Sequence, residues 1–360
     1  MPESDDNNAV GTGRNSTEIL AEMRSRIVSG AARPGSFLPT VRQLGLEYGV
    51  SRGTAWRALK ALAAEGLVIS QPRHGYRVLG SSTGPGQGLS LAYVLSRSKV
   101  ASGWNAYYSS LGRAIEKAAA KRGWKTLKII TDTGREDDLF KQLASTRAWG
   151  LILDSADETL FKRTREFNLP AVLLDIWNPG SGFDAVVQDC FNGARLAVRE
   201  LLKRGCRRIA WFGPIEPDYQ GHHRFGGAAF ALAEEELQFS DVHRLDHGVQ
   251  DILARARALL ESPERADGIL TLSRRALQAV YTTALLLGLK VGKDFQLIGW
   301  SASEIYDEFY GAIFGNSPAP PVVVWSARQM AEQAVARLVE RWANPAMTEA
   351  TITVPTGMRY

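Results

Sequence analysis

The sequence predicts an α/β protein in which a large two-lobed domain follows a small, mainly helical one. Polar, glycine-rich breaks separate two units: the first shows helical periodicity, and the second alternates short apolar strands with amphipathic helices. With 360 residues, 45% of them hydrophobic, the chain exceeds one ordinary domain and contains enough apolar sequence for several cores.

Two polar segments set the expected domain boundaries. Residues 1–15 are rich in Asp, Asn, Gly and Ser, which is typical of a disordered tail, and residues 80–88 have the composition of a flexible linker. We therefore expect one domain over residues 16–79 and a second over residues 89–360.

The first domain is expected to contain three helices and a hairpin. One helix stops near Gly30, the second begins at the capping box of Thr40 and Gln43, and the third runs from Ser51 to Gly66. Apolar runs at 67–69 and 76–79 flank a turn at 71–75, the pattern of a β-hairpin. This order of elements predicts a winged helix-turn-helix.

Positive charge is concentrated in the same domain. The chain has a net charge of +5, and residues 16–80 hold nine Lys and Arg against four Asp and Glu. A basic small domain beside a nearly neutral large one favours binding to a polyanion, and a recognition helix presents its first turns to base edges. The alternative is a solvated basic face on a protein-binding module. Expected DNA contacts are Arg42, Arg52, Thr54, Arg57, Arg73, His74 and Gly75.

Beyond the linker, apolar strands alternate with amphipathic helices. This alternation predicts parallel sheets covered on both faces, with a ligand beyond the carboxyl ends of the strands. Expected strands are 89–95, 127–130, 150–153, 171–174, 208–212, 268–272 and 295–299, and expected helices include 111–121, 194–204 and 276–287.

The first domain resembles the DNA-binding domain of GntR-type regulators. The motifs that carry the resemblance are Leu38-Pro-Thr-Val-Arg-Gln-Leu44, Gly49-Val-Ser-Arg-Gly-Thr54 and Glu65-Gly-Leu-Val68. The resemblance implies DNA contacts at Arg42, Ser51, Arg52, Thr54, His74 and Gly75. The chain departs from the family at Trp56, where the family usually has a basic residue that contacts DNA.

The second domain resembles the effector domain of LacI/GalR-type regulators, a periplasmic-binding-protein-like fold of two Rossmann-like lobes. The resemblance rests on the order of short pieces such as Gln188-Asp189, Arg224-Phe-Gly-Gly227 and Gly299-Trp-Ser301. A GntR-like head on a LacI-like sensor is similar to sugar-responsive repressors of the AraR type. The resemblance implies a ligand-regulated repressor, a homodimer on palindromic operator DNA, and a ligand between the lobes.

Candidate ligand contacts follow from this resemblance and from strand ends. Arg224 matches the arginine of the family, and Asp175 and Asp189 lie just after predicted strands. The aromatic residues are expected to stack on the apolar face of a sugar, with core packing as the alternative for each of them. The aromatic candidates are Trp104, Tyr107, Trp177 and Trp300.

Two departures bear on the nature of the ligand. Where the family usually has a polar pair near the end of a late strand, this chain has Ser273-Arg274. Where the family has an acidic pair after a glycine and an aromatic residue, this chain has Ser301-Ala302. Losing a carboxylate and gaining a cation favours an acidic or phosphorylated ligand, although a degenerate pocket gives the same pattern. Ser273 and Arg274 join the candidate ligand contacts.

Other function classes lack support in the residues. We find no nucleophile elbow, zinc-protease motif or Cys-x-x-Cys, and we expect neither an enzyme nor a cofactor. His243 and His247 are four apart, which suits a metal only if the segment is helical. No run of 18 apolar residues occurs, so we expect a cytoplasmic protein without a membrane partner. The rival interpretation is an enzyme or ligand carrier whose basic head no longer binds DNA.

Overall fold

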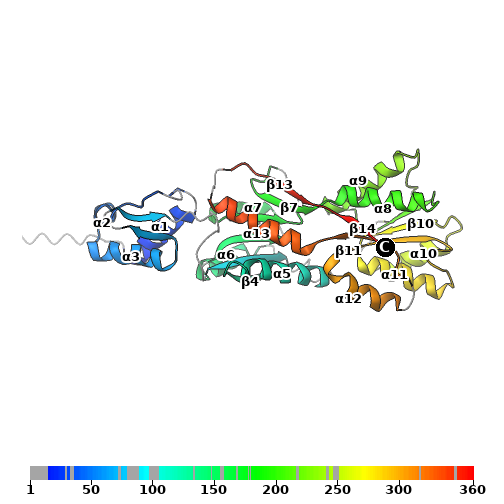
Figure 1. Cartoon of the computed structure of the whole chain (residues 1–360), viewed down its shortest axis with the longest axis horizontal. Helices are drawn as coiled ribbons and strands as arrows, with labels where there is room; N and C mark the ends of the chain where they lie inside the picture. Colours follow the sequence, from blue (N-terminus) through cyan, green and yellow to red (C-terminus); the bar gives the residue numbers. More distant parts are fainter. Residues whose placement is uncertain are drawn as a thin grey trace, which may run out of the picture.

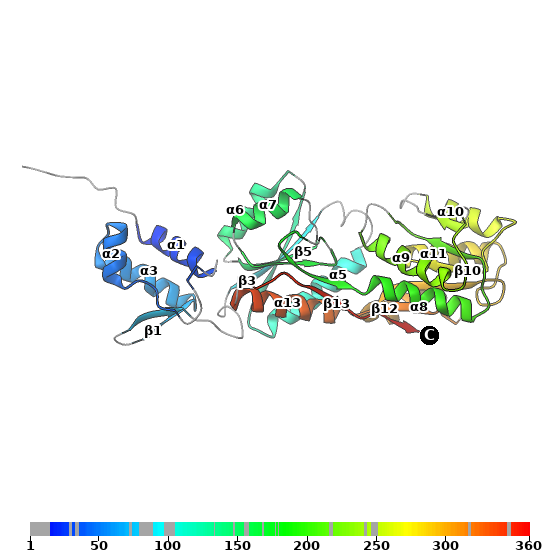
Figure 2. The same ribbon diagram turned by 90° about the horizontal axis from the view of Figure 1, so that it is seen from above.

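The computed structural model places three folded parts in a row along the long axis of the molecule, with the small N-terminal domain at one end (Figures 1 and 2). The described residues are 15–28, 31–32, 36–71, 74–78, 89–96, 105–132, 134–146, 148–154, 158–167, 169–176, 178, 180–215, 219–240, 243–245, 251–315, 318–343 and 347–360. The predicted tail, apart from residue 15, and the whole of the predicted linker lie outside them.

The N-terminal domain is the predicted winged helix-turn-helix. Thr40 and Gln43 form the predicted capping box, and Gly49 ends the second helix with a φ of 64°, a left-handed conformation that glycine adopts without strain. The Ser51 hydroxyl accepts a hydrogen bond from the Thr54 amide at 3.1 Å and caps the third helix. The elements are α1 (Ser16–Val28), α2 (Val41–Tyr48), α3 (Arg52–Ala64), β1 (Val68–Gln71) and β2 (Gly75–Val78).

Apolar packing and one ion pair hold α3 in place. The core includes Ile19, Met23, Leu44, Leu59 and Leu62, each 0% exposed. At the end of α3, two oxygens of the buried Glu65 carboxylate accept hydrogen bonds from Arg24 of α1 at 2.5 and 2.9 Å. This bidentate pair fixes α3 against α1, so the exposed face of α3 is presented on a rigid support.

The second domain has two lobes, each built on a six-stranded sheet. The first sheet is parallel throughout, in the order β13-β7-β6-β5-β3-β4. Its strands are β3 (Ser90–Ser96), β4 (Lys125–Thr131), β5 (Ala148–Asp154), β6 (Ala171–Leu174), β7 (Asp184–Gln188) and β13 (Thr351–Val354). Helices α6 (Glu136–Ser145) and α7 (Glu158–Phe167) cover one face, and α5 (Asn105–Ala120) and α13 (Ala327–Ala343) cover the other.

The sheet of the second lobe has the order β14-β12-β11-β10-β8-β9. Its strands are β8 (Ile209–Phe212), β9 (Arg244–Leu245), β10 (Gly268–Thr271), β11 (Gln296–Ala302), β12 (Val322–Trp325) and β14 (Gly357–Arg359). Helices α8 (Cys190–Lys203) and α9 (Tyr219–Ala233) cover one face, and α10 (Ile252–Glu261), α11 (Arg274–Leu286) and α12 (Ser303–Phe314) pack on the other side. Within the described residues, no helix is long and apolar enough to span a membrane.

The chain passes between the lobes three times, after β7, after β12 and after β13. Two of the crossings are hydrogen-bonded to each other, because the Asp189 amide donates to the Val354 carbonyl at 2.8 Å and the Thr356 hydroxyl donates to the Asp189 carbonyl at 3.1 Å. The second sheet departs from the predicted parallel arrangement at one strand. The chain forms β14 after it re-enters the second lobe from the first, and β14 pairs antiparallel with β12.

Close packing of α8 on α9 requires a glycine at position 227. A β-carbon at Gly227 would lie 2.0 Å from the backbone oxygen of Phe191, whereas one at Gly226 would lie 3.8 Å from the Phe191 ring. We expect Gly227→Ala to lower the free energy of unfolding by about 1–3 kcal/mol through overpacking. Gly226→Ala, the matched control, is expected to be neutral or stabilising because alanine favours helix. Urea melts of both variants check this, and equal midpoints would contradict it.

Candidate DNA-binding surface and ligand site

The exposed face of α3 carries the predicted DNA-binding residues. Arg52, Trp56, Arg57 and Lys60 are exposed on it, and Arg42 is exposed at the start of α2. Thr54 is half-buried and lies beside Ser51 and Arg57, which were also predicted to contact DNA. Its hydroxyl lies 2.9 Å from the Ser51 hydroxyl and accepts from the Arg57 guanidinium at 3.4 Å. Ser51 therefore also has a structural role as the N-cap of α3.

The hairpin places its predicted residues at the turn between β1 and β2. Gly75 has a φ of 96°, and the His74 ring lies 6.1 Å from the ring of Phe37, centroid to centroid. Phe37 bridges to Arg77 of β2, so the wing is attached to the segment that precedes α2. Arg73, also predicted to contact DNA, lies outside the described residues.

At the ligand site, Asp175 follows β6 and points its buried carboxylate toward α5. Its backbone is left-handed, with a φ of 56°, an uncommon conformation for a residue with a β-carbon. The Tyr107 hydroxyl donates a hydrogen bond to this carboxylate, and the Gln188 side-chain amide donates a second one at 2.7 Å. Burial, together with the Asp175 carboxylate, raises the pKa of Tyr107 well above its ordinary value. The phenol therefore keeps its proton and acts as a donor.

Gln188 links this cluster to the second lobe. Its side-chain oxygen accepts a hydrogen bond from the Trp300 indole at 3.0 Å and one from the Arg224 guanidinium at 3.4 Å. The guanidinium carbon of Arg224 also lies 4.5 Å from the centre of a Trp300 ring, within the range of a cation–π contact. Gln220, one turn before Arg224 on α9, accepts from Arg224 at 3.4 Å and donates to the Asp175 backbone carbonyl.

Four of these residues were predicted from the sequence, and two were not. Tyr107, Asp175, Arg224 and Trp300 were predicted from strand ends and from the family resemblance, and the structure brings them together. Gln188 and Gln220 were not predicted as site residues. The four-residue spacing of Gln220 and Arg224 was a detectable signal, because it puts both side chains on one face of a helix.

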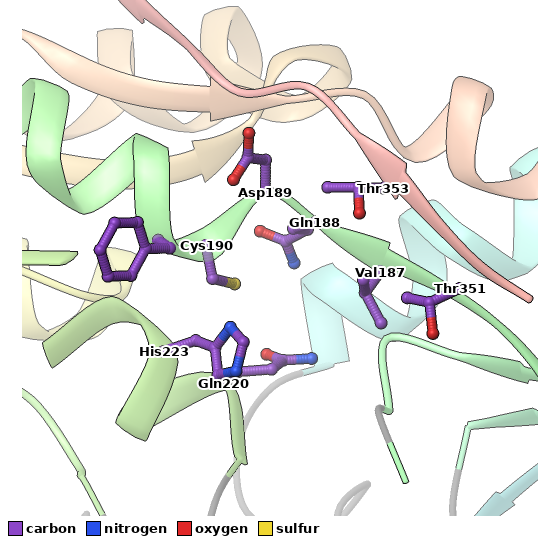
Figure 3. A pocket seen from close by; sticks show the side chains of 9 residues that line it. Val187, Gln188, Asp189, Cys190, Gln220, His223, Thr351 and Thr353 are labelled. Atoms are coloured by element: carbon purple, nitrogen blue, oxygen red, sulfur yellow. The ribbon is translucent and has the colours of Figure 1, made fainter. Parts of the chain in front are cut away.

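A pocket of about 240 Å³ adjoins the cluster where α8 begins (Figure 3). In Figure 3, Gln220 and His223 of α9 face Gln188 and Cys190, while Thr351 and Thr353 come from β13. Burial lowers the pKa of His223, although the Asp189 carboxylate opposes the shift. The volume is below the roughly 300–1,000 Å³ of sites for drug-sized ligands, so the pocket suits a small molecule. Its lining residues are Val187, Gln188, Asp189, Cys190, Phe191, Gln220, His223, Thr351 and Thr353.

Three of the remaining candidates, Asp189, Ser273 and Arg274, lie at the starts of the helices that follow β7 and β10. The Asp189 carboxylate caps α8, accepting from the Asn192 amide at 3.2 Å and its side chain at 2.9 Å, and it also lines the pocket. Ser273 caps α11 by accepting from the Ala276 amide at 3.2 Å, and Arg274 is the next residue. The pocket lining includes neither Ser273 nor Arg274. Trp104 and Trp177 lie outside the described residues.

His243, weighed above as a metal ligand, has contacts on both ring nitrogens. Nδ1 lies 2.9 Å from the Ser240 hydroxyl and Nε2 lies 2.7 Å from the Glu264 backbone oxygen. These contacts, with burial of the side chain, give His243 a role in joining two loops. His247 lies outside the described residues.

Comparison with protein families gives a match in each of the two domains. Residues 15–78 match the family of bacterial regulatory proteins called gntR, and residues 198–360 match the periplasmic binding protein-like domain. The ribose operon repressor of Lactococcus lactis is 23% identical over 327 residues, which cover 88% of this chain and 95% of the relative. The ribose operon repressor of Escherichia coli is 26% identical over 254 residues, covering 68% of this chain and 74% of the relative.

Solved structures show the same fold. A transcriptional regulator CelR–cellobiose complex superimposes with a TM-score of 0.64 at 19% identity, covering 90% of this chain and 99% of that one. A LacI-family regulator from Enterococcus faecium with bound ribose gives 0.61 at 19% identity, covering 75% and 97%. The chain thus joins a GntR-type winged helix-turn-helix to a periplasmic-binding-protein-like domain, and it is a DNA-binding transcription regulator.

Proposed function

We propose that the chain is a repressor that releases its operator when a small polyhydroxylated ligand binds between the lobes. The observation that carries the proposal is the network in which Gln188 connects Asp175 of one lobe to Arg224 and Trp300 of the other. The groups in it match the chemistry of a sugar, because a carboxylate and an amide accept hydrogen bonds from hydroxyls and a guanidinium donates to them. The indole and phenol rings offer apolar faces for the C–H groups of the sugar.

The same network offers a way to couple ligand to DNA. Gln188 and Gln220 connect the lobes through hydrogen bonds within the protein, two between side chains and one from the Gln220 side chain to the Asp175 backbone carbonyl. A ligand whose hydroxyls replace these contacts binds one arrangement of the lobes better than another, and so shifts the population between them. In a homodimer the shift changes the spacing of the two DNA-binding heads, which a palindromic operator detects. The names of the repressors and regulators that the chain resembles support this scheme.

An acidic ligand is a second candidate, favoured by the end of β11. Ser301 and Ala302 occupy the positions after Trp300, and the Ser301 hydroxyl donates to the Ala302 backbone carbonyl at 3.2 Å. No carboxylate stands at these two positions, while Arg224 lies in the site and Arg274 begins the neighbouring helix. A phosphate or carboxylate on the ligand would suit this balance of charge.

The test is fluorescence anisotropy of the purified protein on DNA from upstream of its own gene, against scrambled DNA, at several salt concentrations. We expect tight binding to one fragment, and release by one of ribose, cellobiose or ribose 5-phosphate, which separates the neutral from the acidic ligand. Weak binding to every fragment, falling steeply with salt, would overturn the proposal.

Arg52 provides a first variant for this assay. We expect Arg52→Ala to weaken operator binding by about 1–3 kcal/mol, roughly 5- to 150-fold, because arginine makes two hydrogen bonds to a guanine. Arg26→Ala is the matched control, since it removes the same charge from α1 of the same domain. Equal affinities of the two variants for the operator would refute the assignment of Arg52.

A further inference from the structure

Trp56 lies in the middle of the exposed face of α3. Arg52 and Lys60 are four residues to either side of it, and residues four apart share one face of a helix. Its side chain is 45% exposed. The core of the domain is complete without it, because the α3 residues that pack inward are Ala55, Ala58, Leu59 and Leu62, each at most 1% exposed. The fold therefore gives no reason for a large apolar side chain here.

The surroundings of Trp56 hold the ring and leave space beside it. The Lys60 ammonium lies 4.8 Å from the centre of the ring, a cation–π contact that restrains both side chains. Three residues earlier, Gly53 has no side chain, and a β-carbon there would meet only the Ser51 hydroxyl, at 3.8 Å. Gly53 therefore adds no side chain to the start of α3 beside Trp56.

An indole cannot make the pair of hydrogen bonds by which arginine identifies guanine. An apolar side chain in the major groove instead detects the C5-methyl group of thymine. We propose that Trp56 is a specificity-determining residue that packs against the methyl group of one thymine in the operator. The inference rests on the proposed operator binding, with α3 in the major groove. Four residues advance about 6 Å along a helix, so the thymine lies within about two base pairs of the base that Arg52 contacts.

The experiment removes the methyl group alone. The full-length protein first selects its preferred sites from random duplexes, and each thymine of the best site is then replaced singly by deoxyuridine. For the wild type, we expect one replacement to weaken binding about 4-fold, the effect of burying one methyl-sized group. Trp56→Ala should bind the thymine and deoxyuridine duplexes equally, and Trp56→Arg should select guanine in place of that thymine. Ile69→Ala, which changes a residue that is 48% exposed on β1, should keep the wild-type response.

The outcomes separate this inference from the proposed function. If the protein selects no sequence and binds all duplexes alike, both fail. If it selects a site but no deoxyuridine replacement weakens binding, or if Trp56→Ala shows the same 4-fold loss, the role of Trp56 alone is overturned. Equal melting temperatures of wild type and Trp56→Ala would establish that the variant is folded in each comparison.

Discussion

Replacing Asp184 by alanine is expected to lower the free energy of unfolding by about 3–5 kcal/mol, because the buried Arg337 and the half-buried Arg341 would lose the buried carboxylate that they share. Asp184 begins β7 and its side chain is 0% exposed. It accepts hydrogen bonds from Arg337 at 2.8 Å and from Arg341 at 2.9 Å, both on α13, and from the Ala350 amide at 2.8 Å. The carboxylate thus ties β7 to the helix and strand that the chain forms after returning from the second lobe.

The control for Asp184 uses the same chemistry at the surface. Glu234 accepts hydrogen bonds from Arg195 and Arg199, as Asp184 does from two arginines, but these side chains are 29–52% exposed. Water screens such a pair, so Glu234→Ala should change stability little. Urea unfolding followed by circular dichroism measures both variants. A similar midpoint for the two would show that the Asp184 cluster contributes no more than a surface pair.

The N-terminal domain was predictable because its signals are local. A capping box at Thr40, a glycine at position 49 and a capping serine at position 51 each act within one turn of helix, and all three are present as predicted. The resemblance to a DNA-binding family added the expected role of these helices. The unusual Trp56 was visible in the sequence, but its exposure and its contact with Lys60 required the structure.

Several strands of the two lobes were predicted from apolar runs, although β7 and β12, which are also mostly buried, were not among them. The residues of β6 and β10 are buried throughout and form the apolar runs that indicated them. In contrast, β13 is an edge strand with two of its four residues exposed, and β14 has three residues, so neither gave a strand signal. β13 pairs with β7, and β14 pairs with β12, only after the chain has crossed between the lobes. Local periodicity does not indicate such pairing, because the paired residues are far apart in the sequence.

The ligand site was only partly predictable for the same reason. Asp175 and Trp300 were identified from strand ends and from a family pattern, but Gln188 acquires its role by contacting side chains from three separate segments. Its Trp300 partner lies 112 residues away in the sequence. No helix or strand pattern indicates such a contact, because it arises only when two lobes are assembled.

Arg224→Ala is expected to weaken the response to ligand by roughly 10- to 150-fold, because a hydrogen bond from a charged donor contributes about 1.5–3 kcal/mol. Arg224 is 5% exposed and positioned by Gln188, Gln220 and the Trp300 ring. The measurement is the ligand concentration that releases half of the operator in the anisotropy assay. Operator affinity without ligand is measured beside it, because Arg224 also contacts Gln188 in the network that connects the lobes.

Two further variants distinguish the role of Arg224 from its charge. Arg224→Lys keeps the charge but loses the planar group that stacks on Trp300, so it should recover only part of the response. Arg275→Ala removes an exposed arginine from α11 and should respond as the wild type does. If Arg224→Ala also responds as the wild type does, the ligand does not depend on Arg224, and the adjoining pocket that Gln188, Thr351 and Thr353 line becomes the first place to look for it.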